Sequence, residues 1–145
     1  MSAVNSYKIV LPMKPFGKAR PRCHGKVQPY MPTEYKQKIK DVQCQVNLSE
    51  VPDGPVLVYL NIGYPMPKGW SKAKKDLARG KFCPRSPDVD NVLGALMDAI
   101  FPKVAGGDSR VCGDNTRRYW SDDPQLEMTV LKLQEGEYYD DKNSL

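Results

Sequence analysis

The sequence predicts an α+β fold, a single domain in which two main helices pack on a mixed β-sheet. Segments 7–11, 56–62, 111–120 and 126–133 are short and rich in β-branched, aromatic or alternating apolar residues, as strands are. Segments 33–46 and 88–100 instead repeat apolar residues every three or four positions, as on one face of a helix. A chain of 145 residues can bury one core but not two, so we expect residues 1–145 to form one domain.

A long basic loop is predicted after the first strand. The strand at 7–11 ends at Pro12, and residues 13–32 are rich in proline, glycine, lysine and arginine. Irregular segments of this length inside a compact domain usually bind something, and the charge here favours an anionic partner. We therefore expect this loop to be a binding element.

The first amphipathic helix is expected to begin at Thr33, whose hydroxyl is suited to capping its N-terminus. The sequence Pro-Asp-Gly-Pro at 52–55 then forces a turn into the apolar strand at 56–62. The buried face of the helix is predicted from four residues: Tyr35, Ile39, Val42 and Val46.

A short polar helix is predicted at 72–79. Ser71 is a plausible N-cap, and Gly80 suits its C-terminal stop. The simplest interpretation is a solvated connecting helix, with phosphate contact by its lysines as a second interpretation.

The second amphipathic helix begins near Asp88, and the chain then returns to the sheet. Segments 111–120 and 126–133 are predicted to pair as a C-terminal β-hairpin, joined by a turn at 121–124. The acidic tail at 134–145 is expected to fray. The apolar face of the helix is formed by Leu93, Leu96, Met97 and Ile100.

Composition and charge limit the classes of protein to which the chain can belong. The net charge of +5 comes from 22 basic and 17 acidic residues, with the bases concentrated early and the acids later. A polyanion attracted to the bases would be repelled by the acids unless cations intervene, which suits a phosphodiesterase and also many polar surfaces. Four scattered cysteines and a single histidine argue against a zinc cage. Without an apolar span or signal peptide, we expect a soluble, cytoplasmic protein with no membrane partner.

The segment Arg-Ser-Pro-Asp-Val-Asp-Asn at 85–91 carries the most chemical information. It places Asp88 at the cap of the second helix and Asp90 in its first turn. Acids at this end complement the helix dipole, which is the plain explanation. Two such carboxylates can also converge on a hard cation such as magnesium, with Asp108 or Asp114 as a third oxygen ligand.

Specific residues argue against other kinds of binding or catalytic site. A calcium loop beginning at Asp88 would need glycine at the sixth place, which is Leu93, and glutamate at the twelfth, which is Ala99. A serine nucleophile at Ser109 would depend on His24 as its base. No glycine-rich phosphate loop is present, so we expect no nucleotide cofactor.

Three segments together resemble the RusA-type Holliday junction resolvases, in particular phage and prophage members. Pro-Asp-Val-Asp-Asn at 87–91 is followed by Leu-Met-Asp-Ala-Ile at 96–100. Lys-Ala-Arg-Pro-Arg at 18–22 and Pro-Lys-Gly-Trp-Ser-Lys at 67–72 precede them in the order that the family shows. The resemblance extends over about residues 7–133.

The resemblance implies a homodimeric endonuclease that resolves four-way or branched DNA with Mg²⁺, for which Mn²⁺ can substitute. It implies that Asp88 and Asp90 bind the metal and that Asp108 is the third essential acid, with Asp114 in reserve. It also favours phosphate binding by basic residues, for which the candidates are Lys14, Lys18, Arg20, Arg22, Lys72, Lys74 and Arg85.

One position departs from the family pattern. The family commonly has a lysine four residues after the second aspartate, where this chain has Gly94. Either catalysis is weakened, which leaves a junction-binding or DNA-binding protein as the alternative function, or another base supplies the charge. The candidates for that base are Lys18, Arg20 and Lys103.

Overall fold

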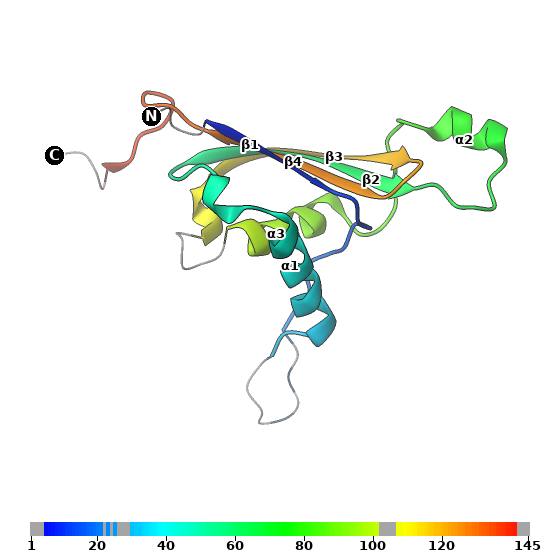
Figure 1. The fold of residues 1–145 in the computed structure, drawn as a ribbon, viewed down its shortest axis with the longest axis horizontal. Coiled ribbons are helices and arrows are strands. Elements are labelled where there is room, and N and C mark those ends of the chain that lie inside the picture. Colours follow the sequence, from blue (N-terminus) through cyan, green and yellow to red (C-terminus); the bar gives the residue numbers. More distant parts are fainter. Residues whose placement is uncertain (1–4, 22, 24, 26–29, 102–106, 142–145) are drawn as a thin grey trace.

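Two helices cover one face of a four-stranded mixed sheet in the computed structural model of the chain (Figure 1). The structure describes residues 5–21, 23, 25, 30–101 and 107–141. Helices α1 (Thr33–Gln45) and α3 (Val89–Ile100) lie against the sheet, whereas the short α2 (Lys72–Ala78) lies beyond one of its ends. The predicted α+β domain with two main helices is confirmed.

The strands follow the spatial order β1 (Ser6–Leu11), β4 (Gln125–Lys132), β2 (Val56–Pro65) and β3 (Val111–Ser121). Strand β4 runs antiparallel to both β1 and β2, while β2 and β3 are parallel. All four predicted strands are therefore present at nearly the predicted positions.

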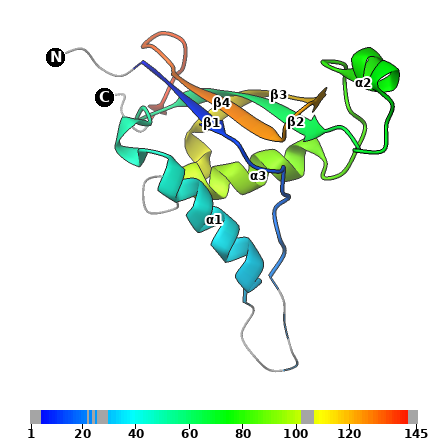
Figure 2. The same cartoon turned by 45° about the vertical axis from the view of Figure 1, so that its right-hand side comes forward.

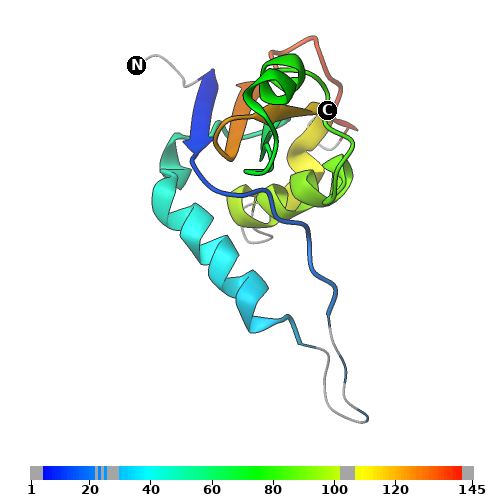
Figure 3. The ribbon, with the colours of Figure 1, turned by 90° about the vertical axis from the view of Figure 1, so that its right-hand side faces the viewer.

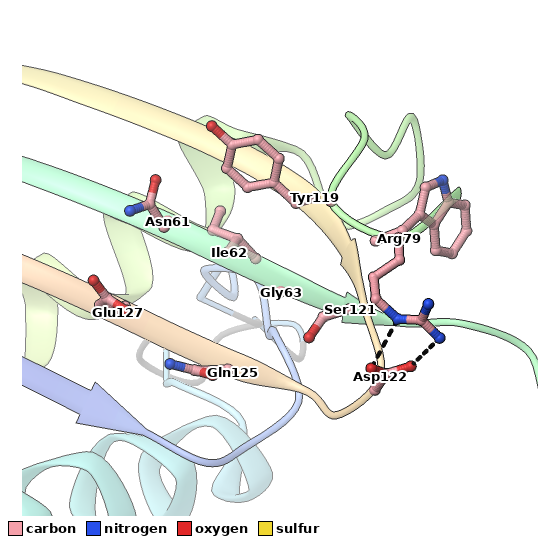
Figure 4. Close-up of a pocket in the computed structure, with 11 residues that line it drawn as sticks. Asn61, Ile62, Gly63, Arg79, Tyr119, Ser121, Asp122, Gln125 and Glu127 are labelled. Atoms are coloured by element: carbon pink, nitrogen blue, oxygen red, sulfur yellow. Dashed lines mark hydrogen bonds and ion pairs between the residues drawn. The ribbon is translucent and has the colours of Figure 1, made fainter. Parts of the chain in front are cut away.

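The predicted C-terminal hairpin is wrong, because β2 lies between β3 and β4. Ser121 pairs with Pro65 and Gln125 pairs with Gly63, so the turn that joins β3 to β4 crosses over β2 (Figure 4). A Cβ atom at Gly63 would lie 3.2 Å from the Ser121 Cβ and 3.4 Å from the Gln125 carbonyl oxygen. The missing side chain of Gly63 makes room for this crossing, which a pattern of alternating residues does not reveal.

The core lies between the sheet and the two long helices. Alternate residues of β2 and β4, such as Leu60 and Val130, are fully buried, as are Val92 and Leu96 on α3. Leu96 and Ile100 of the predicted face of α3 are buried in this core and fix the helix against the sheet (Figure 2). The other two predicted residues, Leu93 and Met97, are only partly buried, because Val92, Ala95 and Ala99 take the central positions.

The ends of the helices follow the predictions only in part. Ser71 caps α2 as predicted, because its hydroxyl accepts the Lys74 N–H at 3.1 Å, and Gly80 follows with φ of +80°. Thr33 does not cap α1: the N-cap is Pro32, which makes no side-chain cap bond, and Thr33 is the first helical residue. The predictions missed two short 3₁₀ turns, η1 (Leu48–Glu50) and η3 (Gly107–Arg110).

The segments between these elements carry little regular structure. The described part of the basic loop at 13–32 forms no helix and none of the four strands, and the side chains at 134–141 are all exposed. No helix in the described ranges is both long and apolar enough to pass through a membrane.

Candidate functional site

Two acidic residues stand at the beginning of α3, as the sequence predicts. Asp88 is the N-cap residue, with φ of −69° and ψ of 157°, and Asp90 lies in the first turn. The Asp88 side chain makes no cap hydrogen bond and remains 68% exposed. Capping by the Asp88 carboxylate therefore does not account for this residue, and the carboxylate stays accessible to a cation.

The loop before α3 is held by the ends of β2 and β3. Arg118 Nη1 donates hydrogen bonds to the carbonyl oxygens of Arg85, at 2.6 Å, and Pro87, at 3.4 Å. The same nitrogen lies 3.7 Å from Asp88 Oδ1. The hydroxyl of Tyr64 also donates to the Pro87 carbonyl, and burial raises the pKa of Tyr64, which keeps this donor protonated.

Neither Arg118 nor Tyr64 was identified from the sequence. Each lies inside a strand whose pattern shows only that its side chain alternates toward the helices. Their partners on the loop before α3 are more than 20 residues away, so no local motif marks them.

The basic loop is docked along α3 through Lys18 (Figure 3). Its backbone N–H donates to the Asn91 carbonyl at 3.0 Å, and its Nζ lies 3.4 Å from Asp98 Oδ1. A Cβ atom at Gly94 would lie only 3.3 Å from Lys18 Cδ. Residues 90, 94 and 98 follow each other at four-residue intervals on one side of the helix, so Lys18 lies over the row that begins at Asp90.

Asp98 is held in turn by Tyr35 on α1. The Tyr35 hydroxyl donates to Asp98 Oδ2 at 2.6 Å, while Lys18 pairs with the other carboxylate oxygen. Burial, with Asp98 as the second cause, raises the pKa of Tyr35 well above its usual value. Tyr35, Asp98 and Lys18 thus form a connected network that fixes the lysine against α3.

The other predicted basic residues do not form a single cluster. Lys14 and Arg85 border a pocket next to Pro87, close to the acids. Lys72 and Lys74 lie on α2, which is beyond the end of the sheet (Figure 1). Lys74 Nζ is 4.5 Å from the centroid of the Trp70 ring. Arg20 is exposed in the described part of the basic loop, and Arg22 and Lys103 lie outside the described residues.

The segment that carries Asp108 lies at the other end of α3. Its 3₁₀ turn, η3, places the guanidinium of Arg110 5.3 Å from the ring centroid of Phe101, the C-cap residue of α3. A helix of 12 residues is about 18 Å long, so the turn is separated from Asp88 by about the length of α3. The side chain of Asp108 lies outside the described part of the structure.

Asp114 is also distant from Asp88. It lies on the same side of β3 as Arg118 but four residues earlier, which corresponds to roughly 13 Å along a strand. Its carboxylate accepts a hydrogen bond from the Thr116 hydroxyl at 2.7 Å. Across the described ranges, no three histidine, cysteine, aspartate or glutamate side chains come together as a metal site.

The donors at the start of α3 nevertheless suit magnesium chemically. This ion usually keeps several waters and takes only one or two protein carboxylates, together with phosphate oxygens of a substrate. Asp88 and Asp90 supply two carboxylates, and both side chains are exposed to solvent.

The described residues form at least three hollows on the surface. One of 350 Å³ lies on the face of the sheet that the helices leave open, where the Arg79 guanidinium is bound to Asp122 at 2.9 Å (Figure 4). The other two, of 460 and 350 Å³, share Pro15, Ser86 and Pro87 and therefore adjoin the residue before Asp88. The two hollows beside the acids are lined by the exposed bases Lys14, Lys38 and Arg85.

Comparison with known proteins agrees with the resemblance in the sequence. The model of the family "Endodeoxyribonuclease RusA" matches residues 12–131. The protein YqaN of Bacillus subtilis strain 168, which is described as uncharacterized, is 29% identical over 130 residues. That alignment covers 83% of this chain and 92% of YqaN.

Proposed function

The chain belongs to the RusA endodeoxyribonuclease family, and on this premise we propose that it is a magnesium-dependent endonuclease that resolves Holliday junctions and other branched DNA. The observation that carries the proposal is the pair of exposed carboxylates at the start of α3, with the amine of Lys18 held against the same helix. This arrangement places metal ligands and a phosphate-binding cation on one element.

Each group has a defined role in this proposal. Asp88 and Asp90 hold Mg²⁺ or Mn²⁺, which when bound polarises a phosphoryl oxygen and makes a water more acidic. Arg118 orients Asp88 and the loop before it. Lys14, with the other exposed bases near the acids, binds backbone phosphates and aligns the scissile bond.

A homodimer supplies the third acid in this proposal. Within one subunit, α3 separates the segment of Asp108 from Asp88 and Asp90 by about 18 Å. A two-fold dimer could bring the C-terminal end of one α3 toward the N-terminal end of the other, so that Asp108 of the partner subunit completes each site. Such a dimer would also match the approximate two-fold symmetry of a four-way junction and its paired nicks.

Lys18 replaces the lysine that the family commonly has at the position of Gly94. Its side chain crosses the space that a side chain at position 94 would occupy, and the network of Asp98 and Tyr35 holds it there. The departure at Gly94 therefore favours a relocated cation over the alternative of a catalytically weakened DNA-binding protein.

A direct assay separates these functions. The protein is incubated with a labelled four-way junction or with linear duplex of the same sequence, in Mg²⁺ or in EDTA. We expect paired, ligatable nicks in the junction and only in Mg²⁺. Junction binding without such nicks would leave the DNA-binding alternative, and equal binding to both substrates would remove the preference for branched DNA.

A further inference from the structure

The aromatic and proline wall of a pocket beside the proposed catalytic acids has no role in the function described above. The volume of the pocket is 350 Å³, within the range of pockets that bind small ligands. Prolines and two aromatic side chains make up most of its wall, among them Tyr64, Pro65, Pro67, Pro87 and Trp120.

The charged side chains that line this pocket are all basic. Lys14 and Arg85 line it, and no aspartate or glutamate is among the described residues that do so. The guanidinium of Arg85 lies over the indole of Trp120, with Cζ 5.6 Å from the ring centroid. The hollow on the open face of the sheet differs, since Asp122 and Glu127 line it and would repel phosphates (Figure 4).

The pocket is built from anchored parts. Pro87, which lines it, is fixed through its carbonyl by Tyr64 and Arg118 and is followed directly by Asp88. Trp120 packs against Trp70, with 4.8 Å between ring centroids. A group bound here would therefore meet a preformed surface at a fixed position relative to the carboxylates.

We propose that this pocket binds an unpaired nucleobase of branched DNA, next to the phosphate that is cleaved. A base is a flat aromatic ring whose faces stack on apolar surfaces and which is flanked by anionic phosphates, so it matches aromatic and proline walls bordered by Lys14 and Arg85. Branch points provide bases that have left their stack, whereas linear duplex does not. The inference rests on the proposed function, because it names the feature of branched DNA that the site recognises.

The test measures the contribution of the base separately from that of the phosphates. A single-stranded oligothymidylate and an oligomer of equal length with abasic residues are titrated against the wild-type protein in EDTA. Stacking of one base on an aromatic side chain predicts that the abasic oligomer binds about 5- to 150-fold more weakly. Trp120→Leu should bind both oligomers with similar affinity, and Trp120→Phe should restore the difference.

Matched variants separate the contribution of the base to binding affinity from that of the positive charges. Arg85→Gln should weaken binding of both oligomers, whereas Arg117→Gln, an exposed arginine on the open face of the sheet, should change neither. Thermal unfolding checks each variant. If Trp120→Leu does not fold, photocrosslinking of wild-type protein to an oligomer with thio-substituted thymidine should still label Trp120 or Tyr64.

The outcomes distinguish this inference from the proposed function. Equal affinity of the wild-type protein for the two oligomers, or crosslinks confined to other segments, would overturn the pocket. Base discrimination by a protein that never nicks a junction in Mg²⁺ would support the pocket and overturn the nuclease. A protein that nicks junctions but binds the two oligomers equally would support the nuclease and overturn the pocket.

Discussion

The two ends of α3 differ in almost every respect that matters for chemistry. At the N-terminal end, the Asp88 carboxylate is 68% exposed and the loop before it is anchored by Arg118. At the C-terminal end, Phe101 is buried and packed under Arg110, whose guanidinium donates to the backbone carbonyl of Gly54 at 3.0 Å. One end is open to ligands and the other is closed by packing, so the two acids of the proposed metal site stand at the open end, while η3, which contains Asp108, follows the closed end.

The largest expected effect is the loss of an acid from either end. We expect Asp90→Asn and Asp108→Asn each to lower the rate of junction nicking by more than about 100-fold, the scale on which a single electrostatic group acts in a catalytic site. Asp114→Asn is the matched control and should leave the rate close to that of the wild type. Single-turnover nicking in Mg²⁺ measures all three, and a severe defect in Asp114→Asn would make that residue the third acid instead.

Mixing the two inactive variants tests whether the ends of α3 meet across a dimer. Subunits with Asp90→Asn and subunits with Asp108→Asn are co-expressed and purified as one sample. If the acids come from different subunits, each mixed dimer holds one intact site and one site with both changes. Random pairing then restores about a quarter of the wild-type nicking sites.

Sites built from a single subunit predict a different result. If all three acids came from one subunit, every site in the mixture would lack one acid, and nicking would stay at the level of the single variants. A chain that remains monomeric by sedimentation at the assay concentration would also contradict the shared site.

A smaller effect is expected from moving the cation that Lys18 holds against α3. Lys18→Ala should lower nicking by about 10- to 100-fold, in line with the loss of one charged hydrogen bond to a phosphate. Gly94→Lys should rescue Lys18→Ala, because removal of Lys18 frees the space into which a side chain at 94 would project. Lys8→Ala is the control, since that lysine pairs with Glu127 on the opposite face of the sheet.

The effect of Gly94→Lys should depend on whether Lys18 is present. With Lys18 in place, a side chain at Gly94 would begin 3.3 Å from Lys18 Cδ, so Gly94→Lys alone should disturb rather than improve nicking. Failure of the double variant to exceed Lys18→Ala would show that Lys18 acts only as one of several phosphate contacts.

Tyr35 on α1 holds Asp98, in the last turn of α3, and its effect should appear mainly in stability. Tyr35→Phe removes the hydrogen bond to Asp98 and should lower the free energy of unfolding at neutral pH by about 0.5–1.5 kcal/mol. The pKa of Tyr35 is raised in the folded state, so its stabilisation is complete below the pKa of an unfolded tyrosine and declines as the pH rises above it. Urea unfolding at neutral and alkaline pH should show a weaker alkaline loss for Tyr35→Phe than for the wild type. An identical alkaline loss in both proteins would mean that other groups carry it.

The smallest effect is expected from the lysines of α2, which lie away from both ends of α3. Lys72→Gln and Lys74→Gln should each reduce by about one the slope of log affinity against log salt concentration, if each lysine contacts one phosphate. Cleavage of bound junction should keep its rate. An unchanged slope would favour the plainer interpretation of α2 as a solvated connecting helix.

Much of the secondary structure follows from the sequence, and so does the position of Asp88 and Asp90 in the proposed site, because both depend on neighbours along the chain. Alternating residues locate the strands, three- and four-residue spacing locates α1 and α3, and the run Pro-Asp-Val-Asp at 87–90 places two acids at the start of a helix. The cap at Ser71 was predictable for the same reason.

The tertiary structure alone decided how these parts are combined. Insertion of β2 between β3 and β4 depends on room above Gly63, and the position of Lys18 depends on the missing side chain at Gly94. Neither contact has a local pattern, because each joins residues more than 50 positions apart. The sequence thus determined which acids and bases are present and on which elements they lie. Packing of the helices on the sheet determined that Lys18 lies over the helix row that begins at Asp90. It also determined that the segment of Asp108 is separated from Asp88 by about the length of α3.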